Sequence, residues 1–468
     1  MGLEGGSLRG KGLLYGGLCL LGVISGCAVN PEEVETEAPV RAPAAWQAGE
    51  DVPDGEVRSW LTDFGDRRLE RLVTQALEEN FSLQAALGRL EQANAVARIE
   101  GAGRLPNLSI GGSAARRSTR LDGDPGPRLR SDQFEVSALA SWEPDLWGRL
   151  KARALAGEAD ALAAAGDYMA LRQSVAAQVA GAYFDTAEER QQLELAAETL
   201  RTFEESLRTV EERFERGIIS ALDVQLARAN VASARSSLLL QRQLADASRR
   251  RLETLVGRYP AGAQSTPEAL PELPAPVPAG LPSALLERRP DLLAAQNRLI
   301  AADARLKESR RALLPSLTLT ASYGQASDEL ENLLENHFDV WSLVGNLTAP
   351  LFQGGRLRAA VDRSEAALRT ALAEYGSVLL NAFREVETAL VAEGLLRDRL
   401  TAVREAAEES TAAQELAEER YDRGLVDIIT VLEAQRRAFT ARSSAIAVQN
   451  QLLQNRLSLY LSLGGEIR

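Results

Sequence analysis

The residues that could do chemistry in this chain are few. His337 is the only histidine, and Cys19 and Cys27 are the only cysteines. Zinc sites built from imidazoles and Ser-His-Asp triads both need a histidine at a defined place, so one histidine excludes nearly all such chemistry within a single chain. Gln353-Gly354-Gly355-Arg356 precedes a helical run but lacks the lysine and Ser/Thr of a phosphate-binding loop. The sequence therefore indicates a protein that is not an enzyme, and we expect no cofactor and no metal site.

Cys27 is the one thiol whose neighbours indicate a reaction. Two basic residues precede an apolar run from 13 to 24, which is too short to span a membrane and is typical of a secretory signal. The run ends in Ile24-Ser25-Gly26-Cys27, which resembles the lipobox of bacterial lipoproteins. We expect residues 1–26 to be a signal peptide and Cys27 to carry an S-diacylglycerol and an N-acyl chain. The alternative is an ordinary signal peptide with a chance cysteine.

The segment after Cys27 predicts an anchored tether. Residues 27–60 are rich in Pro, Glu and Ala, which favours an extended chain. Ala28 stands where bacterial lipoproteins that stay in the inner membrane usually carry aspartate. By that resemblance the destination is the outer membrane.

Two glycine turns reveal an internal duplication. Gly217 lies in RFERGIISALDV and Gly424 in RYDRGLVDIITV, and the same offset of 207 residues carries Tyr168 onto Tyr375. Because a repeat of this length is too long for a solenoid unit, we interpret the chain as one protomer with two similar halves. The expected halves are 61–258 and 283–465, joined by a Pro- and Gly-rich linker at 259–282.

Long proline-free runs predict two antiparallel helical hairpins. We expect long helices at 148–216 and 355–423, with return helices at 220–256 and 427–463. Shorter helices are expected at 69–103 and 284–313. The first long helix carries a heptad seam that needs a partner helix. The seam is Leu193, Ala196, Leu200, Phe203, Leu207, Val210 and Phe214, and the expected partner face is Leu222, Leu226, Ala229, Ser233, Ser236 and Leu240.

The seam of the second hairpin is more polar near its turn. Leu207 and Val210 of the first half are replaced by Gln414 and Ala417 in the second. We therefore expect the first hairpin to stay packed and the second to face water or move.

Four short alternating segments predict strands, at 106–118, 131–143, 315–325 and 338–350. Four amphipathic strands in one chain leave open edges and an apolar face. Since closed barrels satisfy the backbone in lipid, we expect three chains to pool about twelve strands around an open lumen. The predicted fold class is mainly α with a β-barrel contribution, in which the hairpins of a homotrimer form an α-helical cylinder.

The net charge of −13 argues against nucleic acid as a partner, because phosphate binding needs clustered Lys and Arg.

Together with the lipobox and the two tip turns, two strand-to-helix motifs carry a family resemblance. They are Trp142-Glu143-Pro144-Asp145-Leu146-Trp147-Gly148 and Ala349-Pro350-Leu351-Phe352-Gln353-Gly354-Gly355. The chain resembles the TolC-like outer-membrane efflux channels, specifically the lipoprotein branch that serves resistance-nodulation-division pumps. The resemblance implies a passive trimeric duct for small toxic compounds. It also implies a periplasmic adaptor and an inner-membrane pump as partners, and outer-membrane lipid around the barrel.

The resemblance also implies roles for residues at the turns. Gly217, Ser220 and Gly424 would contact the adaptor. Tyr421 and Asp223 would form part of a hydrogen-bonded latch between the hairpins.

Three residues on the last helix would form the constriction, namely Ile429, Thr430 and Glu433. Thr430 and Glu433 lie three apart on one helical face, so three-fold symmetry would turn each into a ring. A ring of Glu433 carboxylates should favour cations. Many relatives have aspartates at both positions, so this sequence departs from the pattern at the gate.

Two other functions remain open on the sequence alone. One is an outer-membrane channel for protein (type I) secretion. The other is a coiled-coil lipoprotein that bridges membrane and cell wall without conducting.

Overall fold

The computed structural model describes residues 39–48, 60–120, 127–265, 267–280, 282–333, 335 and 339–465. Residues from Pro39 onward form one compact unit. The predicted signal peptide, Cys27, His337 and much of the predicted tether lie outside the described residues. None of the described helices carries an apolar stretch suited to crossing a bilayer.

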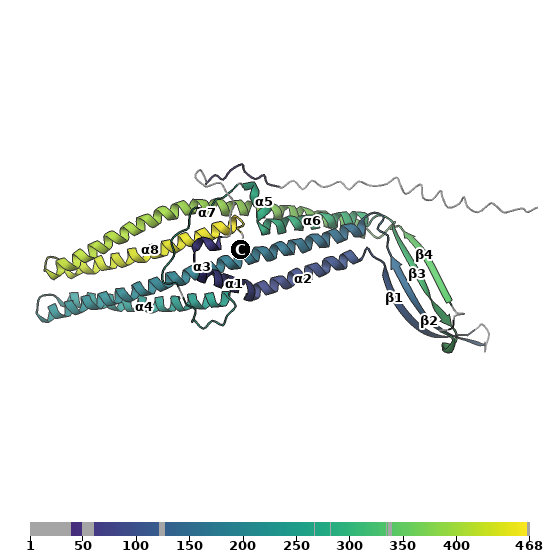
Figure 1. The fold of residues 1–468 in the computed structure, drawn as a ribbon, viewed down its shortest axis with the longest axis horizontal. Coiled ribbons are helices and arrows are strands. Elements are labelled where there is room, and N and C mark those ends of the chain that lie inside the picture. Colours follow the sequence, from purple (N-terminus) through teal and green to yellow (C-terminus); the bar gives the residue numbers. More distant parts are fainter. Residues whose placement is uncertain are drawn as a thin grey trace, which may run out of the picture. The chain divides into compact units, whose positions relative to one another are not determined.

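The two halves of the chain have corresponding helices and strands in the same order, and the second half adds one short 3-10 helix between its strands (Figure 1). The first half contains η2 (Leu61–Phe64), α1 (Arg67–Glu79), α2 (Phe81–Ala102), β1 (Asn107–Arg120), β2 (Arg128–Trp142), α3 (Arg149–Glu215) and α4 (Ala221–Leu255). The second contains η3 (Pro282–Ala284), α5 (Leu285–Arg288), α6 (Pro290–Arg311), β3 (Ser316–Ser327), η4 (Leu330–Asn332), β4 (Asp339–Thr348), α7 (Arg356–Asp422) and α8 (Ile428–Ser462).

Element lengths support the predicted duplication. Helices α3 and α7 both have 67 residues, α4 and α8 both have 35, and α2 and α6 both have 22. The long and return helices end within one residue of the predicted limits, and the four strands within three. The four strands and two hairpins are therefore as the sequence predicts.

The first helix of each half is not continuous, contrary to the prediction of single helices at 69–103 and 284–313. Asn80 and Arg289 interrupt them in extended conformations, with φ −68°, ψ 121° and φ −78°, ψ 118°. The Asn80 side chain accepts hydrogen bonds from the backbone amides of Ser82 and Leu83, which caps the next helix. Arg289 precedes Pro290, whose ring disfavours a helical conformation in the residue before it. Both breaks therefore have local causes, a side-chain cap at Asn80 and the following proline at Arg289.

The four strands form one antiparallel sheet in the order β1-β2-β3-β4. Asn107 pairs with Ser141, Phe134 with Ser327 and Ser316 with Thr348. Strands β1 and β4 are the outer strands of this sheet, and each leaves one edge unpaired among the described residues.

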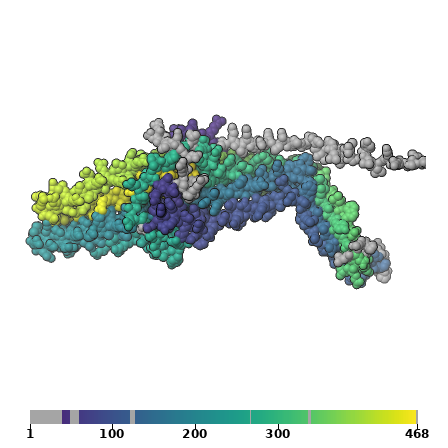
Figure 2. All heavy atoms as spheres, viewed as in Figure 1, coloured from purple at the N-terminus to yellow at the C-terminus, as the bar shows by residue number. Residues whose placement is uncertain are grey.

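The helices form a layer whose members change along its length (Figure 1). Beside the sheet, α2 packs on α3, α3 on α6, and α6 on α7. At the other end, α4 packs on α3, α3 on α8, and α8 on α7. Figure 2 shows the two hairpins lying side by side up to their turns. In both parts α7 is one edge of the layer, and α2 or α4 is the other.

The packed face of α4 differs from the predicted one. The predicted stripe is exposed at several positions, with Leu222 64% exposed. A different set of small and β-branched side chains of α4 packs against α3. These side chains belong to one apolar core that contains residues of both hairpins. These residues are Val224, Ala227, Val231 and Ala234, with Phe203 and Val210 from α3 and Tyr421, Ile428, Val431 and Leu432 from the second hairpin. The packed face is apolar at each of these positions, whereas the predicted stripe contains Ser233 and Ser236, whose hydroxyl groups would need partners if they were buried.

Candidate functional site

The turns of the two hairpins, called the tip here (residues 210–224 and 417–433), have the same backbone. Gly217 and Gly424 lie in the left-handed region, with φ +73° and +72°. The amide of Ile218 donates to the Arg213 carbonyl over 3.0 Å, and that of Leu425 to the Arg420 carbonyl over 2.9 Å. This is the Schellman geometry that ends many helices and requires glycine or asparagine at the turn. Apart from the adjacent residues in the chain, no atom of the described residues lies within 4 Å of the place where a β-carbon would stand at either glycine, so both turns present an open surface.

The helices after the two turns begin with reversed capping pairs. In the first half, the Ser220 amide and hydroxyl both donate to the Asp223 carboxylate over 2.9 Å. In the second half the acid comes first, and Asp427 accepts from the Thr430 hydroxyl over 2.8 Å and its amide over 3.0 Å. These two bonds hold the pKa of Asp427 below its usual value. Ser220 and Thr430 therefore have structural partners within the chain.

Tyr421 and Asp223 are not joined by a hydrogen bond in this structure. Asp223 is engaged with Ser220, and the Tyr421 hydroxyl is buried without a partner among the described residues. The predicted latch between these two side chains is therefore absent from the single chain. Burial is the main cause that raises the pKa of the Tyr421 hydroxyl.

Arg213 makes the contact between the hairpins that the latch was expected to supply. Its guanidinium carbon lies 4.0 Å from the centre of the Tyr421 ring. It donates to the Tyr421 carbonyl over 2.9 Å and to the Asp422 carbonyl over 3.4 Å. Arg213 thus caps the end of α7 with a positive charge, where the helix dipole favours one. The sequence signal was available, since both tip motifs carry arginine at this position.

Ile429, Thr430 and Glu433 lie on the first turns of α8, and Ile429 and Thr430 are exposed. The Glu433 carboxylate accepts from Arg437 Nε over 2.8 Å and from Arg436 Nη2 over 2.8 Å. These arginines, Arg437 first, hold the pKa of Glu433 below its usual value. A ring of Glu433 carboxylates would therefore be accompanied by the guanidinium groups of Arg436 and Arg437 in each chain. The expected preference for cations did not take these positive charges into account.

Polar side chains tie α8 to both long helices above the tip. Gln435 is buried, and its Nε2 donates to Ser206 on α3 over 3.0 Å and to Glu418 on α7 over 2.8 Å. Gln414 also donates to Glu418, over 2.9 Å. The polar residues of the second seam therefore form hydrogen bonds with one another, and Gln435 extends these bonds to Ser206 of the first hairpin.

A buried ion pair holds the linker between the halves. Arg456 on α8 is fully buried and makes two hydrogen bonds to Glu393 on α7, over 2.6 and 2.9 Å. It also donates to the carbonyls of Pro274 and Ala275 over 3.1 and 2.6 Å. The linker at 259–282 is thus fixed to the second hairpin at its middle.

A family model described as outer membrane efflux protein matches residues 72–258 and 281–465, which are the two repeats. The chain belongs to the outer membrane efflux protein family. The toluene efflux pump outer membrane protein TtgF of Pseudomonas putida is 33% identical over 466 residues, which are 96% of each chain. The outer membrane protein OprJ of Pseudomonas aeruginosa is 34% identical over 453 residues, covering 94% of this chain and 93% of OprJ.

Solved structures of outer-membrane channels have the same fold. The OprN channel superposes with a TM-score of 0.87 at 28% identity, covering 94% of this chain and 100% of OprN. The open-state MtrE channel of Neisseria gonorrhoeae gives a TM-score of 0.83 at 28% identity, covering 94% and 99%. This member of the efflux protein family is therefore an outer-membrane channel component of an efflux system, and it is a conduit and not an enzyme. The alternative of a non-conducting structural lipoprotein is set aside.

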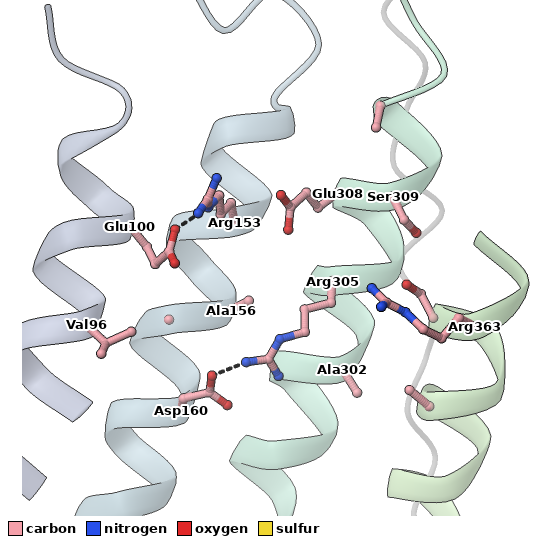
Figure 3. A pocket seen from close by; sticks show the side chains of 14 residues that line it. Val96, Glu100, Arg153, Ala156, Asp160, Ala302, Arg305, Glu308, Ser309 and Arg363 are labelled. Atoms are coloured by element: carbon pink, nitrogen blue, oxygen red, sulfur yellow. Dashed lines mark hydrogen bonds and ion pairs between the residues drawn. The ribbon is translucent and has the colours of Figure 1, made fainter. Parts of the chain in front are cut away.

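Near the sheet, the efflux protein carries a charged groove of about 690 Å³ between α2, α3, α6 and α7 (Figure 3). Glu100 pairs with Arg153, and Asp160 pairs with Arg305, across neighbouring helices. These four charges are paired with each other, whereas Glu308 and Arg363, which also line the groove, form no ion pair with another described residue. No cluster of metal-binding side chains occurs among the described residues.

A second polar cluster lies where α3 crosses α8. Asn450 Nδ2 donates to Asp185 over 3.0 Å and to Glu188 over 2.5 Å. Gln454 Nε2 donates to Asp185 and to the Gly181 carbonyl, each over 2.9 Å. Burial is the main cause that raises the pKa of Glu188 to about 7. Sequence reasoning missed this cluster because its members lie more than 250 residues apart.

Proposed function

We propose that three copies of this efflux protein close into one channel through the outer membrane. The observation that carries the proposal is that both layers of the chain end in open edges. The sheet ends at β1 and β4, and the helical layer ends at α7 on one side and α2 or α4 on the other. Three copies would pool about twelve strands, a number suited to an outer-membrane barrel. Exposed apolar side chains on the outer strands, such as Ile110 and Leu343, fit a surface that contacts lipid.

The proposed partners are a periplasmic adaptor at the tip and, through it, an inner-membrane pump of the resistance-nodulation-division class. Gly217, Ser220 and Gly424 are the proposed adaptor contacts, and the open space at both glycines supports this role. TtgF is named as part of a toluene efflux pump, and small toxic compounds are the proposed substrates here. A wide aqueous duct would exert little selection, so the pump would choose the substrate.

Ile429, Thr430 and Glu433 are the proposed constriction. They lie on the first turns of α8, next to the tip. Arg213, which caps α7, would hold the two hairpins together in the closed state. Opening would then require the Arg213 contacts with Tyr421 and Asp422 to break.

The decisive experiment is reconstitution of the purified full chain. We expect a trimer by light scattering in detergent and stepwise conductance in planar bilayers. A stable, water-soluble monomer without conductance would contradict the proposal.

Tip docking is tested separately in a strain that lacks its own channel component. We expect Gly424→Glu to abolish drug resistance while the trimer still forms, because a bulky charge would occupy the adaptor surface. Gly424→Asn is the matched control, since asparagine tolerates the left-handed backbone and adds no charge. Full resistance with Gly424→Glu would exclude docking at this turn.

The gate is tested by Glu433→Ala combined with Tyr421→Phe. We expect a larger single-channel conductance than in the parent protein. An unchanged conductance in a correctly assembled trimer would remove both residues from the gate.

Lipidation is tested by mass spectrometry of the mature N-terminal peptide. We expect Cys27 to be the first residue and to carry the mass of a diacylglycerol and one acyl chain. The Cys27→Ser variant should carry neither the diacylglycerol nor the acyl chain. An unmodified Cys27 in the parent protein would disprove the lipid anchor.

A further inference from the structure

The two faces of the four-stranded sheet differ in polarity. The register assigns each strand residue to one face, because paired residues point to the same side and successive residues to opposite sides. One face is apolar and includes Leu108, Ile110, Phe134, Trp142, Tyr323 and Trp341. The other carries mostly small or polar residues, such as Ser109, Ser113, Ser137, Thr320 and Ser342. In the proposed barrel the apolar face contacts lipid and the polar face lines the lumen.

The apolar face ends in four arginines on the β1–β2 hairpin, called the arginine rim here (Arg116, Arg120, Arg128 and Arg130). Strand β1 starts at Asn107, close to the end of α2, so the rim lies at the end of the hairpin away from the helices. The register pairs even-numbered residues of β1 with even-numbered residues of β2. All four arginines therefore share a face with Ile110 and Phe134.

The arginine rim carries more positive charge than the described residues around it neutralise. Arg116 forms an ion pair with Asp132, over 2.6 Å. Arg120 and Arg128 stand directly opposite each other in the register, where like charges repel. Arg120, Arg128 and Arg130 are exposed, and none forms a hydrogen bond or ion pair with another described residue. In a chain with a net charge of −13, three such cations on one hairpin end indicate a site for an anion.

The position of the arginine rim along the strands corresponds to the level of lipid headgroups. On β2 the apolar side of the strand runs from Phe134 to Trp142. Eight steps of about 3.3 Å give about 27 Å along the strand, or about 20 Å across the membrane once strand tilt is included. This length is close to the apolar band of about 25 Å in outer-membrane barrels. Beyond Phe134 the same face continues with Asp132 and the arginines, where the hydrocarbon would end.

The second half of the duplication lacks these positive charges at its described counterparts. The offset of 207 residues carries Arg116, Arg120 and Arg128 onto Tyr323, Ser327 and Glu335. Both hairpins belong to the same sheet and extend away from the helices. Positive charge at this level is therefore a property of the β1–β2 hairpin and does not follow from the duplicated fold.

We propose that the arginine rim binds the phosphate groups of lipids in the outer leaflet around the channel. A guanidinium group offers paired N–H donors that match phosphate oxygens. Basic clusters beside a membrane also attract anionic headgroups. Arg120, Arg128 and Arg130 supply the free donors, while Asp132 holds Arg116. The inference rests on the proposed outer-membrane barrel and names the class of lipid that its outer end would bind.

Native mass spectrometry of the purified trimer in detergent tests this binding. The probes are a lipid A with two phosphate groups and the same lipid with both phosphates removed. We expect the parent protein to bind the phosphorylated lipid at least tenfold more tightly. The triple variant Arg120→Gln, Arg128→Gln and Arg130→Gln should bind both lipids equally.

Arg117→Gln is the matched control for a single charge. Arg117 is exposed on β1, but the register places it on the polar face. We expect Arg117→Gln to keep the tenfold preference, whereas Arg120→Gln alone should lower it. An equal loss in both single variants would mean that net charge, and not the arginine rim, attracts the lipid, which would overturn the proposal.

Thermal dissociation of the trimer distinguishes a lipid site from a site for free phosphate. The phosphorylated lipid should raise the temperature at which the parent trimer dissociates and leave that of the triple variant unchanged. Inorganic phosphate in excess should have no effect on either protein. An equal rise with inorganic phosphate alone would show an anion site that needs no lipid and would overturn the proposal.

The outcomes also separate the lipid site from the proposed channel. If the parent trimer conducts but binds both lipids equally, or if the triple variant keeps the preference, the lipid site is wrong and the channel stands. If the purified chain is a monomer without conductance, both are overturned.

Discussion

The two hairpins share one backbone and differ in what holds them. Around the first, the buried residues of the seam near the turn are aliphatic or aromatic, with Phe203 and Val210 against Val224 and Val231. Around the second, buried polar groups enter the seam, and Gln435 contacts both long helices at once. Helix length and turn geometry are therefore independent of seam chemistry. Both copies of the duplicated hairpin keep the same backbone, while the second copy supplies the polar contacts that join the two halves.

The difference is sharpest at the middle of the molecule. Arg456 and Glu393 form a buried ion pair in the second half, and their counterparts in the first half are Arg249 and Thr186. Among the residues that the structure describes, Arg249 donates only to a carbonyl of its own helix, that of Ala245. The first hairpin instead buries the Glu253 carboxylate, which accepts hydrogen bonds from the backbone amides of Gly262, Ala263 and Gln264.

The largest expected effect is from Arg456→Met. Removal of the cation leaves the Glu393 carboxylate without its buried partner and frees the linker, at a cost of about 3–5 kcal/mol. Arg249→Met is the matched control and should cost less than about 0.5 kcal/mol, as surface changes do. Chemical unfolding in detergent, followed by helical circular dichroism, measures both. Equal losses in the free energy of unfolding for the two variants would mean that the buried Arg456–Glu393 pair does not stabilise the second hairpin specifically.

The next effect is a pH dependence from Glu188, whose counterpart in the second half is Leu395. The folded-state pKa of Glu188 is about 7, above the value of an exposed carboxyl, so the folded state keeps a proton that the unfolded state releases. Stability from this group is present at pH 4 and is lost as the pH rises through 7, by about 2 kcal/mol.

Glu188→Gln should remove this loss, because the amide oxygen can still accept from Asn450 without a charge. The free energy of unfolding at pH 8 should then rise relative to the parent protein. Glu194→Gln, on the exposed side of α3, is the control and should leave the pH profile unchanged. A parent profile that is flat between pH 5 and 8 would contradict the assignment.

A smaller effect is expected at the tip. Arg213→Met loses the stacking on Tyr421 and two bonds to carbonyls at the end of α7, worth about 1–2 kcal/mol. Hydrogen exchange of the amides at 417–422 should therefore become about tenfold faster. Arg216→Met, at an exposed arginine of the same turn, should leave exchange as it is. If both variants exchange alike, Arg213 does not join the hairpins.

The smallest effect on stability is expected from Glu433→Gln, less than about 1 kcal/mol because the ion pairs are exposed. The change frees Arg436 and Arg437, so the reversal potential in a salt gradient should shift toward anions. Glu419→Gln, in an exposed pair with Arg423 before the turn, is the control. An unchanged selectivity would place Glu433 away from the narrowest part of the pore.

Much of the tip could be predicted from the sequence, but its contacts could not. Gly217 and Gly424 were identifiable because a left-handed turn between two long helices leaves glycine as the favoured residue. The partner of Tyr421 could not be identified from the sequence. Asp223 instead accepts hydrogen bonds from Ser220, which lies three residues away, and this local bond competes with a bond to the distant Tyr421. Arg213 was visible as a repeated motif residue, but only the packing of the two hairpins against each other brings it onto the Tyr421 ring.

By itself the sequence determined the duplication, the lengths of the long helices and the positions of the four strands. These properties are local, because periodicity, proline and glycine act within a few turns of the chain. Tertiary structure alone decided which face of α4 packs, that Arg456 is buried, and that Glu188 is half-buried against polar side chains of α8. These depend on the distance between helix axes and on residues hundreds of positions apart, which no local pattern records.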